Sequence, residues 1–199
     1  MDIREEDGAR IRALMREGER LDDLKRDGMR ILQRPDGFCF GMDSVLLASF
    51  AAARQARGRA VDLGTGSGVL PLLLCARMRD IAFDAVELQP DIADMADRSV
   101  RICRMEHRIR VHAMDLRDAP ARLGHEKHVL AVSNPPYGRP GGGVKNPSAA
   151  RSTARHEGEA GIADICRTAF SLLQNGGRLA VVFPAPRLLE LFDAMRAAR

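Results

Sequence analysis

The chain has 199 residues, of which 45% are hydrophobic, and 31 basic against 27 acidic residues give it a net charge of +4. This size suits one globular domain with a substantial core and leaves no room for a second full domain. Its longest apolar stretches, such as "SVLLASFAAA", are too short to span a bilayer, and its charged N-terminus is unlike a signal peptide. We therefore expect a soluble, cytoplasmic protein.

The four cysteines and five histidines are scattered along the chain. Neither a C-x-x-C pair nor an H-x-x-x-H pair occurs, so we expect free thiols and neither a disulfide nor a metal site.

The first 57 residues predict a helix, a hairpin and a second helix. Residues 1–20 mix acids and bases around apolar residues at helical spacing, as in a solvated amphipathic helix. In "MRILQRPDGFCF", the Pro-Asp-Gly turn at 35–37 lies between two β-like runs and predicts a hairpin. Asp43 and Ser44 then precede "VLLASFAAA" and predict a capped helix start. We divide the chain into a charged segment, 1–23, and a domain, 24–199.

From residue 58 onward, β-like and helical segments alternate. The predicted strands are "RAVDL", "IAFDAVEL", "RIRVHAM", "HVLAVSN" and "RLAVVFP", and the predicted helices are "VLPLLLCARM", "DIADMADRSVRICRM", "IADICRTAFSLL" and "RLLELFDAMRAA". This alternation predicts a doubly wound α/β fold with a mostly parallel sheet covered by helices on both faces.

A glycine-rich turn, "AVDLGTGSGV", joins the first of these strands to its helix. Gly64, Gly66 and Gly68 let the backbone approach a ligand closely. Asp62 stands two residues before the first glycine, where a carboxylate would repel a pyrophosphate but attract an ammonium group. S-adenosylmethionine carries such a group, and we predict it as the cofactor.

Acidic residues also follow the next two strands. Glu87 lies roughly 20 residues past the glycine loop, where a ribose-binding acid is expected, with Leu88 beside it. Asp115 follows the third strand and can accept a hydrogen bond from an adenine amino group, with Leu116 against the ring. These residues complete a predicted cofactor site at three successive strand ends.

The fourth strand ends in "SNPPYGRP", beside the glycine loop in such a sheet. The Asn134 side-chain oxygen and the Pro135 carbonyl can accept both hydrogens of a planar amino group and aim its lone pair at a methyl donor. Pro135 and Pro136 have no N–H and hold these acceptors rigidly. Tyr137 is expected to stack on the planar substrate.

The motifs "DLGTGSG", "VELQ", "MDLRD" and "NPPY" resemble those of class I S-adenosylmethionine-dependent methyltransferases that modify amino groups. "FCFGMDSVLLASFA" and the later "ARHE" are more narrowly similar to the tRNA1(Val) adenine-N6 methyltransferase family, over roughly Leu24 to Arg196. The resemblance implies methylation of a tRNA adenine 3′ of the anticodon. It also implies that Phe40 and Asp43 border the methionine end of the cofactor and that Asn134 contacts cofactor as well as substrate.

A polar loop, "GRPGGGVKNPSAARSTARHE", follows the NPPY motif. A glycine-rich basic loop can become ordered on RNA phosphates, with salt-sensitive affinity. Its predicted RNA-binding residues are Arg139, Lys145, Arg151, Arg155 and His156.

Several alternatives stay open at this point. The same NPPY chemistry serves methylation of a release-factor glutamine amide or of an rRNA adenine, and a non-catalytic cofactor-binding partner subunit would keep the same pocket. A DNA adenine methyltransferase normally needs a longer recognition insertion. The resembling fold usually adds two more strands, so we expect either C-terminal truncation or another chain covering the edge strand. The sequence leaves the oligomeric state open.

Overall fold

The computed structural model describes residues 3–37, 39–136 and 160–199. The strands are β1 Arg20–Asp23, β2 Arg30–Gln33, β3 Gly58–Leu63, β4 Ile81–Glu87, β5 Ile109–Ala113, β6 His128–Ser133 and β7 Leu173–Val181. The helices are α1 Ile3–Leu14, α2 Met42–Ala52, α3 Val69–Arg77, α4 Pro90–Ile102, α5 Ala119–Leu123, α7 Ile162–Leu172 and α8 Leu188–Ala197, with 3-10 turns η1 Leu116–Asp118 and η2 Ala185–Arg187.

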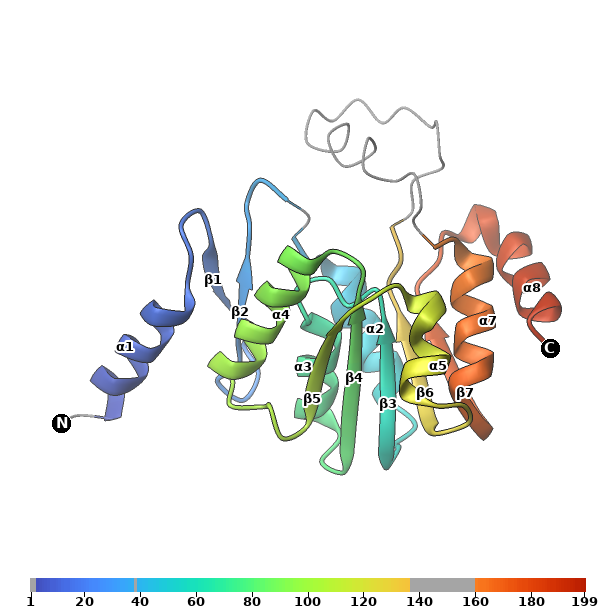
Figure 1. Ribbon diagram of the computed structural model, residues 1–199, viewed down its shortest axis with the longest axis horizontal. Helices are drawn as coiled ribbons and strands as arrows, with labels where there is room; N and C mark the ends of the chain where they lie inside the picture. The colour runs from blue at the N-terminus through green and yellow to red at the C-terminus, as the bar shows by residue number, and fades with distance from the viewer. Residues whose placement is uncertain (1–2, 38, 137–159) are drawn as a thin grey trace.

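The main sheet has five strands in the order β5-β4-β3-β6-β7, and all neighbours are parallel (Figure 1). The chain winds outward from β3 to β5 on one side and from β6 to β7 on the other. The winding therefore reverses between β3 and β6, and ligands in open α/β sheets bind outside the carboxyl ends of the strands at such a point. The predicted doubly wound, mostly parallel α/β fold is confirmed.

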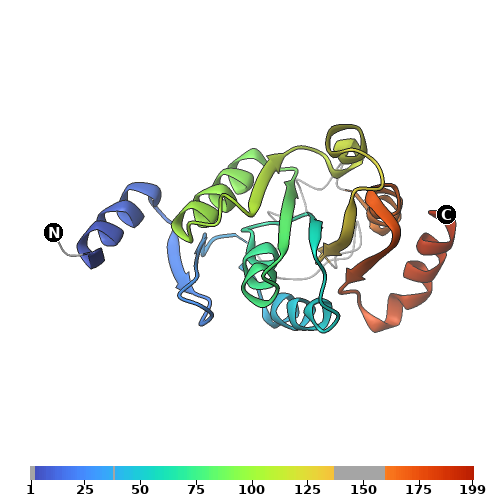
Figure 2. The same cartoon turned by 90° about the horizontal axis from the view of Figure 1, so that it is seen from below.

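Helices cover both faces of this sheet because the side chains of each strand alternate between two cores (Figure 2). Ala60 of β3 and Leu130 of β6 belong to the core beneath α2, α3 and α4. Val61 and Ala131, the next residue on each strand, belong to the core beneath α5 and α7. The short helix α5 was missed by the sequence analysis, which placed no element there.

A hairpin is present, but the predicted one about the Pro-Asp-Gly turn was wrong. β2 pairs antiparallel with β1, so Leu21 faces Leu32, and the turn between them contains Lys25 and Asp27 at positive φ. The Pro-Asp-Gly segment instead follows β2 and leads toward α2. Leu32 is fully buried against Met95 and Ile102 of α4, and Leu21 of β1 packs against the same cluster, which favours β1 as the partner despite its charged sequence.

The predicted cap of α2 was also wrong. Gly41 is the N-cap residue and makes no side-chain capping bond, whereas Asp43 and Ser44 lie inside the first turn. Asp43 is exposed and Ser44 is buried. The two residues therefore lie on different faces of the helix, and Ser44 points into the protein.

An ion pair and hydrogen bonds from Arg98 of α4 hold the N-terminal segment against this helix. Arg98 and Glu19 form an ion pair at 2.5 Å, with side chains only 7% and 4% exposed. Arg98 also donates to Leu14 O at 2.7 Å and to Asp94 at 2.8 Å. Burial alone would raise the pKa of Glu19, but the bonds from Arg98 and from the Arg16 backbone lower it overall. The predicted boundary at 23/24 falls at the end of β1, within this hairpin.

β7 is the edge of the described sheet, next to β6.

All four cysteines are free, as expected, and Cys75 and Cys166 are buried. Among residues 3–37, 39–136 and 160–199, no helix has the length and apolar character needed to cross a membrane, and no group of three or more candidate ligands is placed to hold a metal ion.

We expect Arg98→Met to lower the free energy of unfolding by about 3–5 kcal/mol, because it leaves the Glu19 carboxylate buried without its partner. Urea denaturation of the purified chain measures this loss. Arg57→Met is the matched control, since its pair with Asp80 is exposed at both ends and is worth less than about 1 kcal/mol. Equal losses in the two variants would contradict a dominant role for the buried pair.

Candidate active site

The glycine loop follows β3 and is fixed by the neighbouring strand. The backbone N–H groups of Gly64 and Thr65 both donate to Val86 O of β4, at 3.0 and 2.9 Å. Gly64, Gly66 and Gly68 all have φ in the left-handed region, at 78°, 56° and 87°. A Cβ built on Gly64 or Gly66 would meet no atom within 4 Å, so the loop has an open side.

Asp62 lies beneath this loop with none of its surface exposed. Its Oδ2 accepts a hydrogen bond from Thr65 Oγ1 at 2.7 Å. Its Oδ1 is buried and has no hydrogen-bond partner among the described residues. Burial raises the pKa of Asp62 to about 7, the Thr65 bond opposes this shift, and the Glu87 charge adds to it. An unsatisfied buried acceptor of this kind suits a ligand that brings a donor or a positive charge.

Glu87 ends β4 and is 7% exposed. It accepts from the backbone N–H of Gly66 at 2.9 Å and from that of Gln89 at 3.0 Å. These bonds attach the carboxylate to the glycine loop on one side and to the start of α4 on the other. Leu88, the next residue, is 44% exposed and offers an apolar surface beside the carboxylate.

Asp115 follows β5, which is joined to β4 by the bond from Met114 N to Glu87 O at 2.9 Å. Its carboxylate accepts from the backbone N–H of Arg117 at 2.8 Å and pairs with the Arg117 guanidinium. These Arg117 contacts lower the pKa of Asp115 against a smaller effect of burial. Leu116 packs partly against the core beneath α5 and α7. The sequence analysis missed Arg117, although its spacing from Asp115 was visible in "MDLRD".

Asn134 follows β6 directly and lies across the switch point from the glycine loop. The preceding Ser133 donates its hydroxyl to Leu63 O at 2.7 Å, which ties the carboxyl ends of β6 and β3 together. The Asn134 side-chain Nδ2 donates to Ser44 Oγ of α2 at 3.0 Å. Pro135 is half-buried and Pro136 is exposed.

The segment before α2 is positioned by the hairpin. The Phe40 backbone N–H donates to Gln33 Oε1 at 2.8 Å, and the half-buried Phe40 packs against the main core. Gln33 is 2% exposed and also donates to Asp22 of β1. The first turn of α2, with Asp43, is thus brought to the same edge as Asn134, and the predicted role of Phe40 and Asp43 in cofactor binding stays a prediction.

Two functionally placed residues, Ser44 and Gln33, were missed by the sequence analysis. Ser44 stands at the head of the buried face of α2, one or two turns before Leu47, Ala48 and Ala51. A polar residue at the head of an apolar helical stripe has to find a partner inside the protein. That signal was present, but the partner itself was not predictable.

Outside the described residues lie the remaining predicted site residues, Tyr137, Arg139, Lys145, Arg151, Arg155 and His156.

A second buried aspartate, Asp84 of β4, differs from Asp62 because both of its carboxylate oxygens have partners. His112 contacts its Oδ1 at 2.9 Å, His128 contacts its Oδ2 at 3.1 Å, and Arg59 pairs with the same oxygen. Burial alone would raise the pKa of Asp84, but these bonds outweigh it and hold the pKa well below its ordinary range. This cluster joins strands β3 to β6 and has its acceptors satisfied, as expected of a structural group.

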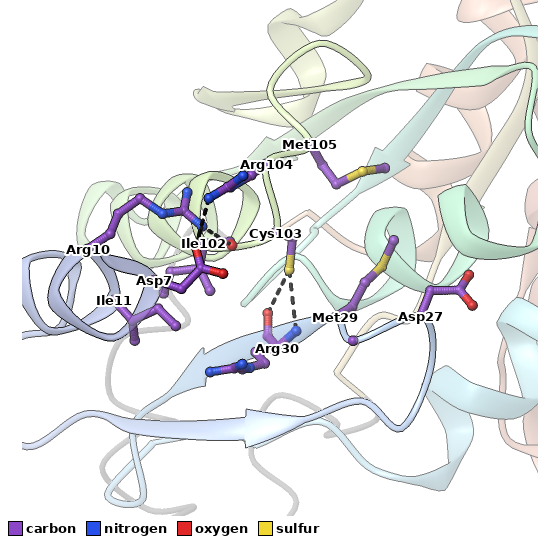
Figure 3. A pocket seen from close by; sticks show the side chains of 11 residues that line it. Asp7, Arg10, Ile11, Asp27, Met29, Arg30, Ile102, Cys103, Arg104 and Met105 are labelled. Carbon is purple, nitrogen blue, oxygen red and sulfur yellow. Dashed lines mark hydrogen bonds and ion pairs between the residues drawn. The ribbon is translucent and has the colours of Figure 1, made fainter. Parts of the chain in front are cut away.

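A hollow of about 330 Å³ lies between α1, the hairpin turn and the C-terminal end of α4 (Figure 3). Its polar groups link α1 to the end of α4. Arg10 donates to Arg101 O and Ile102 O, and Arg104 pairs with Asp7. α4 begins beside Glu87 and is 13 residues long, about 20 Å. The hollow is therefore a helix length away from the strand ends and is not part of the candidate site.

Residues 40–197 match the family model described as the methyltransferase small domain. Three similar curated relatives are named tRNA1(Val) (adenine(37)-N6)-methyltransferase. The one from Tolumonas auensis is 38% identical over 72% of this chain and 58% of its own length. The one from Erwinia tasmaniensis is 32% identical over 82% of this chain and 71% of its own length. The one from Aeromonas salmonicida is 36% identical over 76% of this chain and 61% of its own length. The chain thus spans less than two thirds of the length of two of these three relatives.

Solved structures are similar in fold. A predicted O-methyltransferase from Agrobacterium tumefaciens has a TM-score of 0.59 and 25% identity, with 77% of this chain and 66% of that chain covered. Geranyl diphosphate C-methyltransferase from Streptomyces coelicolor, solved with S-adenosyl-L-homocysteine, has a TM-score of 0.57 and 16% identity, with 78% and 60% covered.

The two buried aspartates give opposite dependences of stability on pH. Because the folded-state pKa of Asp62 is raised from 3.8 to about 7, its ionisation removes stability as pH rises through that window. We expect the difference in unfolding free energy between Asp62→Asn and wild type to move by roughly 3 kcal/mol in favour of the variant between pH 4 and pH 8.

Asp84→Asn is the matched control for this measurement. The depressed pKa of Asp84 contributes stability that is fully present above the ordinary carboxyl pKa and lost only in acid. Asp84→Asn should have a lower free energy of unfolding than wild type at pH 8. This difference should not shrink as pH rises from 4 to 8. A flat Asp62→Asn difference across the same range would show that Asp62 is not held in a poorly solvated site.

Proposed function

Since the chain belongs to the methyltransferase small domain family and, within it, to the tRNA1(Val) (adenine(37)-N6)-methyltransferases, we propose that it methylates N6 of a tRNA adenine, the one 3′ of the anticodon. The observation that carries this proposal is the juxtaposition of Asn134 with the glycine loop across the β3/β6 switch point. The family's cofactor is S-adenosylmethionine, and a tRNA substrate is consistent with the predicted cytoplasmic location.

The residues beneath the loop fit this cofactor. Asp62 Oδ1 is a buried acceptor with no partner in the part of the chain that the structure describes, and it suits the ammonium group of the cofactor. A positive charge there would favour the ionised form of a carboxyl whose pKa is raised to about 7. The carboxylate of Glu87, held beside the glycine loop by Gly66 and Gln89, is an acceptor of the kind that ribose hydroxyls require. The exposed face of Leu88 and the acceptors of Asp115 suit an adenine ring.

When bound, S-adenosylmethionine supplies an electrophilic methyl group on a sulfonium. Asn134 and Pro135 would accept the two N–H hydrogens of the substrate amino group, which frees its lone pair from the π system and fixes its direction. Ser133 holds the backbone of this segment to β3, so the acceptors are positioned before substrate arrives. Catalysis then depends mainly on positioning and electrostatics. Tyr137 and the basic loop residues keep their predicted roles in base stacking and phosphate binding.

The first test is transfer of labelled methyl from S-adenosylmethionine to unmodified tRNA, ribosomal RNA, duplex DNA and a release factor, followed by nucleoside analysis. We expect N6-methyladenosine in tRNA, and Asn134→Ala should reduce kcat by roughly 10²–10³-fold because it removes an acceptor aimed at the reacting group. Cofactor affinity should change little.

Three other outcomes of this assay decide between the alternatives. Label only in the release factor would assign glutamine methylation, and label only in ribosomal RNA would change the substrate. Equal activity of wild type and Asn134→Ala would contradict the mechanism. Cofactor binding without transfer to any substrate would favour a non-catalytic partner subunit.

Glu87→Gln should weaken S-adenosylmethionine binding by roughly 10–100-fold, because charge-assisted bonds to the ribose are lost and the glycine loop loses its anchor. Isothermal titration calorimetry measures this directly. Glu106→Gln is the matched control, because Glu106 is exposed beyond the far end of α4. Unchanged affinity in Glu87→Gln would remove this carboxylate from the cofactor site.

A further inference from the structure

Ser44 is a buried hydroxyl at the candidate active site, and its predicted role in capping α2 was wrong. It is 2% exposed and lies in the first turn of α2. Its Oγ accepts the hydrogen bond from Asn134 Nδ2 at 3.0 Å, across 90 residues of chain. The Ser44 end of this bond is buried and the Asn134 end is half-buried, which limits competition by water for the bond.

The two ends of the Asn134 side chain have opposite chemistry. The amide nitrogen only donates and the oxygen only accepts, and a half-turn about the last side-chain bond exchanges them. A substrate amino group presents donors, so it requires the oxygen. With the exchanged orientation the amide nitrogen would face the substrate, and two donors would oppose each other. The orientation of this amide therefore decides whether the proposed reaction can proceed.

We propose that Ser44 is a positioning residue for methyl transfer: by accepting from the Asn134 NH₂, its hydroxyl favours the amide orientation that directs the amide oxygen toward the substrate amino group. This inference rests on the proposed function. Ser44 can hold a fixed position because its helix is anchored by the buried Leu47, Ala48 and Ala51. The other end of the bond is fixed as well, since Ser133 ties the adjacent backbone to β3.

A direct test uses the side-chain NH₂ signals of Asn134 in the ¹H–¹⁵N spectrum of the full chain, assigned by their loss in Asn134→Ala. We expect slow exchange with water in wild type and exchange at least about 10-fold faster in Ser44→Ala, because the shielded bond is gone. The matched control is Ser99→Ala. Ser99 is also fully buried and hydrogen-bonded, to Leu32 N and Met95 O, but it lies in α4 away from Asn134. Identical Asn134 signals in wild type and Ser44→Ala would overturn the proposal.

A kinetic test separates positioning from general destabilisation. Ser44→Ala should lower kcat for methyl transfer by roughly 10-fold while KM for tRNA and Kd for S-adenosylmethionine stay within about 2-fold, since only alignment is lost. Ser99→Ala should leave kcat unchanged. In the Asn134→Ala background, Ser44→Ala should cause no further loss, because Ser44 acts through that amide. An additive loss, or an equal loss in Ser99→Ala, would refute the proposal.

The two proposals fail in distinguishable ways. If wild type methylates no substrate, the proposed function fails, while the exchange measurement still decides whether Ser44 holds the Asn134 amide. If wild type methylates tRNA and Ser44→Ala is as active as wild type, only the positioning role fails.

Discussion

The hydrogen bond from Ser133 Oγ to Leu63 O joins the carboxyl ends of β6 and β3 at the point where the winding of the sheet reverses. Each bonded residue is followed directly by a segment of the site, Leu63 by Gly64 and Ser133 by Asn134. A shift between these two strands would separate the proposed cofactor side of the site from the proposed acceptor side. The bond is buried, so water does not compete for it, and the remaining site geometry is built outward from this junction.

Two buried aspartates on adjacent strands show how environment assigns different roles to one side chain. Asp84 is surrounded by Arg59, His112 and His128 and has its acceptors satisfied, which makes it a stabilising group of the sheet. Among residues 3–37, 39–136 and 160–199, Asp62 has a hydroxyl partner on one oxygen and none on the other, as expected of a destabilised group with capacity for a ligand. Unsatisfied buried groups are rare in native proteins because they are costly, and their presence at a strand end points to function.

The N-terminal segment contributes to the site although it supplies none of the proposed catalytic contacts. The buried pair of Arg98 with Glu19 fixes this segment on α4, and the hairpin then presents Gln33 to the Phe40 backbone. The chain leaves that contact and enters α2, whose buried face carries Ser44 to Asn134.

The sequence by itself determined the parallel sheet, because strands buried on both faces need continuous apolar runs between helices. It also determined which strand ends carry Asp62, Glu87, Asp115 and Asn134, since parallel strands bring their carboxyl ends to one edge. The tertiary structure alone decided the pairing of β1 with β2, because burial of Leu32 against α4 outweighed the charged character of β1. It likewise decided that Ser44 meets Asn134, since a contact between residues 90 positions apart depends on how α2 packs and leaves no local pattern in the sequence.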